Sequence, residues 1–235
     1  MAGEVKGAAK VAARLEELFK GENGGVKGSK AEEYVREYYT RDQFYGSAFD
    51  DTLTVPYQFT EQDLLRLSLP SVPASGSIVR DLQRGFFTEP LDECGGVSLN
   101  ALLAEIPQNL TFEDLDDEEF QNHLAVGSPA DTLWKAITKI SPTRNWEMGQ
   151  TSTSKLLAAK RPYLIPIYDS VVEKAFGKSG SADHWTDMRE LFTQDEDLAS
   201  QLRSLSKLSG KRVSVIRLLD VVLWMDGRKG HSKVD

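Results

Sequence analysis

The sequence has little that would tie it to a membrane, a disulfide framework or a metal. It contains one cysteine, Cys94, in 235 residues, so no internal disulfide can form. Its three histidines, His123, His184 and His231, lie far apart, and no zinc, P-loop or serine-nucleophile spacing occurs. No apolar run approaches the length of a membrane span, and polar residues rather than a signal-peptide core follow Met1. We therefore expect a soluble, cytoplasmic protein with no membrane partner, no metal and no cofactor.

Basic residues are missing from one long stretch of this acidic chain, whose net charge is -8. From Phe86 to Trp134 there are eleven Asp or Glu and no Lys or Arg, a net charge of -11. The next segment, Lys135 to Gly180, has eight Lys or Arg against three Asp or Glu, a net charge of +5. The first segment suits a basic protein partner, and the second is where an anion would bind.

An amphipathic pattern predicts a helix at the N-terminus, from about Glu4 to Lys20. Four apolar side chains fall on one face at helical spacing: Val11, Leu15, Leu18 and Phe19. A glycine-rich joint follows from Gly21 to Gly28. The sequence thus predicts a separable N-terminal helix with its joint, residues 1–28, and a body of residues 29–235. The helix either docks on that body or serves a partner.

Helix start and stop signals recur along the body. Thr60 and Asp63 have capping-box spacing, and Ser128 precedes a proline at a first helical position. Residues 215–225 are apolar on almost every side, which predicts a central helix ending at Gly227. Only the short stretches Ser77 to Leu82 and Pro162 to Ile167 resemble strands. The predicted fold is mainly α, a single helical domain.

Two other patterns have alternative interpretations. The aromatic run from Tyr34 to Phe49 is typical of base stacking or, alternatively, of core packing. The acidic cluster from Glu113 to Glu119 suits a hard cation or a solvated face, and it lacks the ligand spacing of a calcium loop.

Residues 146–169 have the most distinctive composition. Gly149 predicts a tight turn into a helix whose first backbone N–H groups are free to bind an anion. The candidate nucleic-acid-binding residues of this turn and helix are Gly149, Thr151, Ser152, Lys155, Lys160 and Arg161. In the alternative interpretation, Thr151 or Ser152 caps this helix. Ser170 and Glu173 then form a capping box for the next helix, after Asp169.

The run Ser154 to Val172 resembles the central motif of an actinobacterial domain family of unknown function. The resemblance extends to Tyr38–Phe44, Phe59–Leu64 and Leu218–Met225, and so spans most of the chain beyond residue 30. Membership implies no known activity.

A more local resemblance covers residues 146–172, which are similar to the helix-hairpin-helix region of base-excision DNA glycosylases. There a glycine turn opens a helix and an aspartate begins the next one, matching Gly149 and Asp169. The resemblance implies that the turn holds a DNA phosphate and that Asp169 is a catalytic residue for a flipped base. Thr151 stands where lyase-competent members carry a lysine, so the sequence leaves enzymatic activity open.

Two functions follow from these patterns. The first is a helix-hairpin-helix-like module associated with DNA or another nucleic acid. The alternative is a non-enzymatic protein-interaction protein that uses its acidic segment or its N-terminal helix.

Overall fold

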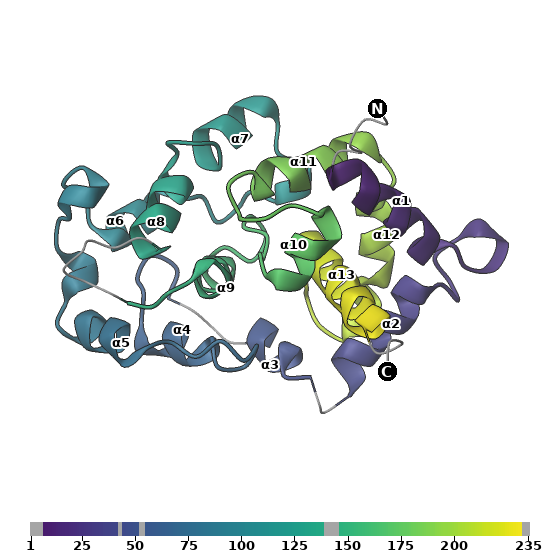
Figure 1. Ribbon diagram of the computed structural model, residues 1–235, viewed down its shortest axis with the longest axis horizontal. Helices are drawn as coiled ribbons and strands as arrows, with labels where there is room; N and C mark the ends of the chain where they lie inside the picture. The colour runs from purple at the N-terminus through teal and green to yellow at the C-terminus, as the bar shows by residue number, and fades with distance from the viewer. Residues whose placement is uncertain (1–6, 42–43, 52–54, 139–145, 232–235) are drawn as a thin grey trace. The chain divides into compact units, whose positions relative to one another are not determined.

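The computed structural model describes residues 7–41, 44–51, 55–138 and 146–231. This part of the chain contains thirteen α-helices and five short 3-10 helices (Figure 1). Its only β interaction is an isolated bridge between Leu91 and Val97. The prediction of a mainly α fold is therefore confirmed.

The chain groups into two compact units, residues 1–47 with 168–235 (unit 1) and residues 48–167 (unit 2). Unit 1 holds α1 (Gly7–Phe19), η1 (Glu22–Gly24), α2 (Lys30–Thr40), α10 (Ser170–Phe176), α11 (His184–Gln194), α12 (Leu198–Leu205), η5 (Ser206–Ser209) and α13 (Val215–His231). Unit 2 holds α4 (Glu61–Arg66), α5 (Gly76–Gln83), η2 (Phe86–Thr88), η3 (Asp92–Cys94), α6 (Leu99–Glu105), η4 (Phe112–Asp114), α7 (Asp117–His123), α8 (Pro129–Thr138) and α9 (Gln150–Lys160). α3 (Gly46–Asp51) crosses the boundary between the units. The predicted boundary at residue 28 lies inside unit 1 and remains a prediction.

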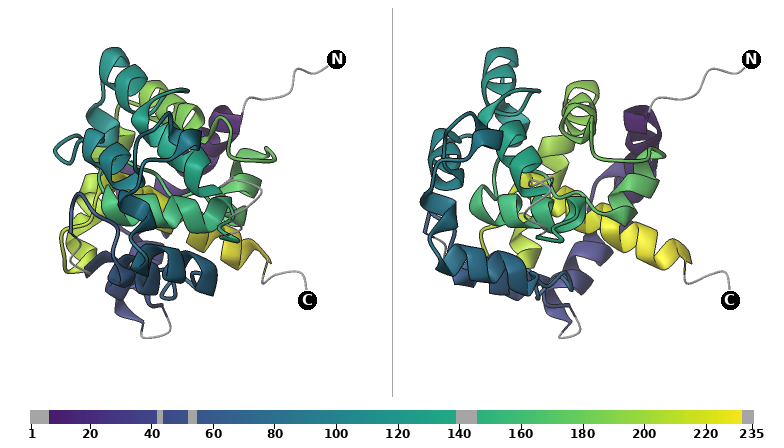
Figure 2. Two further views of the ribbon diagram at one scale, coloured as in Figure 1. Left: turned by 90° about the vertical axis from the view of Figure 1, so that its left-hand side faces the viewer. Right: turned by 60° about the vertical axis from the view of Figure 1, so that its left-hand side comes forward.

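The core of unit 1 forms around α13, which packs against α2, α10 and α12 (Figure 2). Leu218, Leu219 and Val222 are fully buried, as the all-round apolar pattern predicts. The prediction that Gly227 ends this helix is wrong, because α13 continues to His231. A Cβ at Gly227 would lie 2.4 Å from the Cγ1 of Val171, so this glycine serves the close approach of α10.

The N-terminal helix docks on unit 1. The described part, α1, buries Val11, Leu15, Leu18 and Phe19 and packs against α2, α10 and α11. The expected start near Glu4 lies outside the described residues. Beside this buried stripe, the guanidinium of Arg14 donates to both carboxylate oxygens of Asp226, at 2.9 and 2.8 Å. Of the two alternatives, docking on the body or serving a partner, the structure thus adopts docking.

The aromatic run is divided between buried and partly exposed positions. Tyr34, Tyr38 and Phe49 are buried, so core packing is the observed arrangement for these three rings. In unit 1, the ring of Tyr38 stacks on Phe44 at a centroid distance of 5.5 Å and meets Trp224 edge-on at 5.9 Å. Buried aromatic rings supply large apolar area to a core.

The predicted helix starts in unit 2 are confirmed. The carboxylate of Asp63 accepts hydrogen bonds from the backbone N–H and hydroxyl of Thr60, at 2.8 and 2.9 Å. The Oγ of Ser128 accepts a hydrogen bond from the N–H of Asp131 at 3.2 Å, and α8 follows. Short-range caps of this kind depend on neighbouring residues only, which is why the sequence predicts them.

Both strand predictions are wrong. Ser77 to Leu82 lies within α5, whose first turn is capped by Ser75 and whose Ile78 is fully buried. Pro162 to Ile167 forms neither a helix nor a strand. The N–H of Phe112 in η4 donates a hydrogen bond to the carbonyl of Tyr163 in this segment. Short alternating runs fit a helix face as well as a strand.

Over the described residues, no helix combines the length and apolar character needed to cross a bilayer.

Candidate functional site

A helix, α9, begins directly after Gly149, as the sequence predicts. Gly149 is the N-cap of α9, in an extended conformation, and no atom lies within 4 Å of where its Cβ would be. Thr151 and Ser152 lie half-buried in the first turn. Because the N-cap is Gly149, neither Thr151 nor Ser152 caps the helix. The described residues therefore leave room for a side chain at Gly149.

The predicted cations of α9 are not displayed on a basic surface. Lys155, Lys160 and Arg161 are only 8%, 3% and 2% exposed, respectively. The sequence-based expectation of a shared, solvent-facing basic patch at these three positions is wrong. A nucleic-acid backbone that approached the start of α9 from solution would therefore not contact these three side chains.

Arg161 is committed to backbone carbonyls of unit 2. Its guanidinium donates to Ile106 O at 2.7 Å, to Pro56 O at 2.8 Å, to Lys160 O at 2.9 Å and to Leu103 O. Leu103 and Ile106 lie at the C-terminal end of α6, where Leu103 O also accepts the N–H of Ile106 at 3.3 Å. Burial lowers the pKa of Arg161 to about 10. This side chain therefore joins the ends of α6 and α9 to the loop before α4.

Lys160 forms a buried ion pair with Asp63. The two side chains are 0% and 1% exposed, and the ammonium also donates to Val55 O at 3.0 Å. Burial lowers the pKa of Lys160, and the carboxylate of Asp63 opposes that effect. The Oδ1 atom of Asp63 has no hydrogen-bond donor among the described residues. The sequence marks Asp63 as a capping residue but contains no local signal for its pairing with Lys160.

A third buried cation, Arg66 of α4, follows the same pattern. Its guanidinium donates to the carbonyls of Phe49 and Ala159, at 2.5 and 3.3 Å. These carbonyls lie in the last turns of α3 and α9. Cations are stabilised at helix C-termini by the helix dipole. The guanidinium groups of Arg66 and Arg161 therefore both bind carbonyls at helix ends.

Asp169 is the N-cap of α10. Its Oδ1 atom accepts hydrogen bonds from the N–H groups of Val171 and Val172, at 2.9 and 3.0 Å, and the residue is 6% exposed. The cap is thus Asp169 itself, one residue earlier than the alternative in which Ser170 pairs with Glu173. The catalytic role that the glycosylase resemblance implies for Asp169 remains a prediction.

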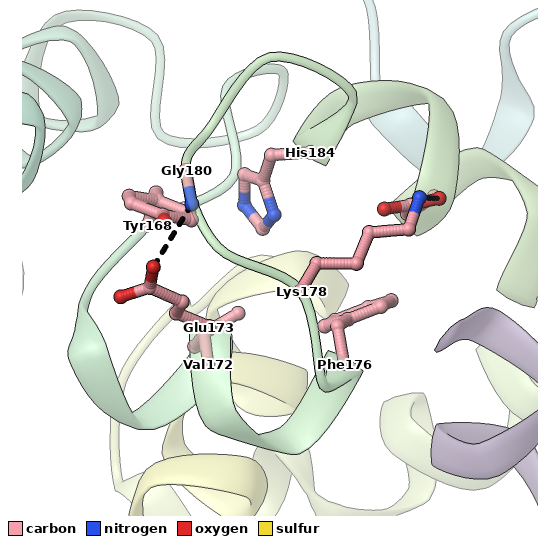
Figure 3. Close-up of a pocket in the computed structure, with 8 residues that line it drawn as sticks. Tyr168, Val172, Glu173, Phe176, Lys178, Gly180 and His184 are labelled. Carbon is pink, nitrogen blue, oxygen red and sulfur yellow. Dashed lines mark hydrogen bonds and ion pairs between the residues drawn. The ribbon is translucent and has the colours of Figure 1, made fainter. Parts of the chain in front are cut away.

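A pocket that the sequence did not indicate lies in unit 1, between α10 and α11 (Figure 3). Its cavity volume is about 10 Å³, about the size of one water molecule. The side chains that define its chemistry are Tyr168, Glu173, Phe176, Lys178, His184 and Asp187. The buried imidazole of His184 meets the rings of Tyr168 and Phe176 edge-on, at 5.1 and 6.1 Å. Only the fold brings this set together, since it comes from two helices and the loop joining them.

The polar contacts of the pocket hold that loop. Glu173 Oε1 accepts a hydrogen bond from Gly180 N–H at 2.9 Å, and Lys178 Nζ lies 2.6 Å from Asp187 Oδ1. The hydrogen bond to Asp187 raises the pKa of Lys178. Burial, and then the negative charge of Glu173, raises the pKa of Tyr168 to about 12. The phenol is therefore neutral at physiological pH.

The net negative charge of the chain lies in unit 2. Unit 2 has seventeen Asp or Glu against nine Lys or Arg, a net charge of -8, whereas unit 1 has nineteen of each and is neutral. Exposed carboxylates of the segment 86–134 are Glu89, Asp92, Glu105, Asp114, Asp116, Asp117 and Glu118. Four of the nine cations of unit 2 are buried: Arg66, Lys155, Lys160 and Arg161. The surface of unit 2 is accordingly acidic.

The acidic cluster around α7 shows no cation site. Among the described residues, no group of three or more His, Cys, Asp or Glu side chains could hold a metal ion. Asp116 and Glu119 instead form the capping box of α7, with N–H to carboxylate distances of 2.7 and 3.1 Å. The cluster matches the solvated-face interpretation of the sequence.

Fold and site together define a mainly helical protein in which two buried arginines, Arg66 and Arg161, bind helix ends and the surface of one unit is acidic. The chain belongs to a family of unknown function, DUF6308, which matches residues 31–227. The resemblance to a family of unknown function beyond residue 30 is thereby confirmed. No curated protein and no solved structure matches the chain.

Proposed function

We propose that this protein binds a basic protein partner through its acidic segment, residues 86–134, and that it acts by binding rather than by catalysis. The observation that supports the proposal is the separation of charge in unit 2. Seven carboxylates of the segment are exposed, while four cations of the same unit are buried. A surface of one sign attracts partners of the opposite sign and accelerates their encounter.

The buried cations favour this proposal over a nucleic-acid function. Arg161 would have to leave four backbone carbonyls before it could reach a phosphate. Releasing Lys160 would leave the carboxylate of Asp63 buried without its counter-ion. The exposed carboxylates of α7 would meanwhile repel a polyanion. Releasing these cations costs more free energy than a surface contact with a phosphate contributes.

The N-terminal helix is less suited to the same role. Its four apolar side chains are already buried within unit 1. A partner would have to displace α1 from α10 and α11 to use that face. The acidic segment needs no such rearrangement.

The experiment compares wild type with the double variant Asp117→Lys, Glu118→Lys. Both side chains are exposed on α7, and neither belongs to the Asp116–Glu119 capping box. The matched control, Glu22→Lys with Glu196→Lys, makes the same change of net charge at exposed positions of unit 1. The probe is a synthetic lysine-rich peptide, and its affinity is measured by fluorescence anisotropy at several salt concentrations.

We expect the α7 variant to bind the peptide about tenfold more weakly than wild type at low salt, because two favourable charge contacts become repulsive. The control variant should bind like wild type. Equal losses in both variants would mean that only net charge matters and would overturn the assignment to the acidic segment.

A second candidate, nucleic-acid association, is favoured by one observation: the described residues leave room for a side chain at Gly149, where α9 begins. Its binding residues would be Gly149, Thr151 and Ser152. A salt series with single- and double-stranded oligonucleotides tests it, with Ser152→Glu as the variant that adds a carboxylate to the first turn. Binding that weakens as salt is added and is lost in Ser152→Glu would support this function over the first.

A further inference from the structure

We propose that three exposed apolar side chains of unit 2, Val55, Tyr57 and Leu65, form a docking surface for a segment of another protein that carries both cationic and apolar side chains. We call these three side chains the apolar surface. The inference rests on the function proposed above for the basic character of the partner, and it adds an apolar contact outside the acidic segment.

Exposed apolar side chains are concentrated in this part of the chain. Among the described residues, five large apolar side chains are exposed, and three of the five form the apolar surface. Val55, Tyr57 and Leu65 are 47%, 54% and 70% exposed, respectively. Single exposed apolar residues are common on soluble proteins, whereas groups of them mark interaction sites. Three such side chains within eleven residues therefore call for a partner.

Two buried cations fix the backbone of the loop that carries Val55 and Tyr57. Lys160 Nζ donates to Val55 O at 3.0 Å, and Arg161 Nη1 donates to Pro56 O at 2.8 Å. The guanidinium of Arg161 also lies 5.9 Å from the ring centroid of Tyr57. The loop is thus held from inside unit 2 while its two apolar side chains stay exposed. A loop that is already ordered loses little conformational entropy when a partner binds.

The same ammonium group joins this loop to α4, the helix that carries Leu65. Lys160 pairs with Asp63 of α4 in the interior of unit 2, and it also binds Val55 O. The loop and α4 therefore lie side by side. Leu65 follows Asp63 by two residues, which places it on the other side of the helix, toward solvent. One short segment of a partner can therefore reach both the loop and the helix.

The charges around the apolar surface favour a cationic partner. Glu61 lies one helical turn before Leu65 on α4 and is exposed. The neighbouring cations Arg66, Lys160 and Arg161, in contrast, are at most 5% exposed. An approaching partner thus meets a carboxylate beside the apolar side chains and none of these three positive charges. Lysine or arginine on the partner complements the carboxylate, and its apolar side chains cover the apolar surface.

The test compares two synthetic peptides of equal length and charge by fluorescence anisotropy at constant ionic strength. One peptide contains lysine and serine, and in the other two of the serines are replaced by leucine. The variants of the full chain are Leu65→Gln and Tyr57→Gln. Val126→Gln is the matched control, because Val126 is an exposed apolar residue of unit 2 outside the apolar surface.

We expect wild type to bind the leucine-containing peptide about tenfold more tightly than the lysine-serine peptide, because apolar area is buried in that complex alone. Leu65→Gln and Tyr57→Gln should each lose most of this preference, and Val126→Gln should keep it. An equal preference in Leu65→Gln and Val126→Gln would overturn the proposal. This comparison stands even where Tyr57→Gln does not fold, since the side chain of Leu65 lies largely in water.

The outcomes separate this inference from the proposed function. If wild type binds both peptides equally, the docking surface fails and the proposed function stands. If Leu65→Gln removes the preference but the variant Asp117→Lys, Glu118→Lys binds like wild type, the proposed function fails and the docking surface stands. A wild-type dimer that Leu65→Gln abolishes in sedimentation velocity would assign the surface to a second copy of the chain and overturn the proposed partner.

Discussion

Replacing Arg161 by glutamine should strongly destabilise unit 2. The substitution removes the positive charge and the fork of donors that holds Leu103, Ile106 and Pro56. Glutamine has two N–H donors and no charge, so at least one of these three carbonyls loses its side-chain donor and every bond that remains comes from a neutral group. The side chain is 2% exposed, and water cannot easily replace the lost bonds.

The magnitude follows from those bonds. A hydrogen bond from a charged donor contributes about 1.5–3 kcal/mol, and a buried acceptor left unsatisfied costs about 1–3 kcal/mol. Allowing for relaxation, we expect Arg161→Gln to lower the free energy of unfolding by about 3–5 kcal/mol. For a chain of this size, the melting temperature should fall by about 2–4 °C for each kcal/mol lost.

The assay is urea and thermal unfolding followed by circular dichroism, with Arg84→Gln as the control. Arg84 lies exposed at the end of α5, and its substitution should change stability by less than about 0.5 kcal/mol. A loss below about 1 kcal/mol for Arg161→Gln would refute the reasoning, since the guanidinium would then lie in water. The nucleic-acid interpretation of the sequence gives the opposite expectation, weaker oligonucleotide binding with little change in stability.

Three further predictions concern unit 1. Leu219 is fully buried in α13, so Leu219→Ala should cost about 2–5 kcal/mol in urea unfolding, and a loss below about 0.5 kcal/mol would place the side chain outside the core. Gly227→Ala should destabilise although alanine favours helices, because its Cβ would meet Val171; adding Val171→Ala should restore stability, and an unchanged loss would exclude the clash as its cause. The pKa of Tyr168 lies near 12, above its ordinary value of 10.0, so the folded state keeps the phenol protonated longer than the unfolded state. This contribution to stability is complete below about pH 10 and is lost as pH rises to about 12. The loss should be measurable by unfolding at alkaline pH and absent in Tyr168→Phe; an identical pH dependence in the two proteins would contradict it.

Features that depend on adjacent residues could be predicted from the sequence. The Thr60–Asp63 and Ser128–Asp131 caps form because both members lie within one helical turn. The apolar stripe of α1 and the burial of α13 follow from helical spacing for the same reason. The strand predicted from Ser77 to Leu82 failed, because six residues of alternating polarity do not distinguish a strand from one face of a helix.

The sequence by itself determined the helical class, the uneven distribution of charge and the family to which the chain belongs. Only the tertiary structure decided which charges meet solvent. Lys160 lies 97 residues from Asp63, and Arg161 lies 58 residues from Leu103, so neither contact leaves a local pattern. Whether a cation is buried depends on whether distant carbonyls and carboxylates can replace the water that hydrates it. Composition and spacing along the chain do not specify this replacement.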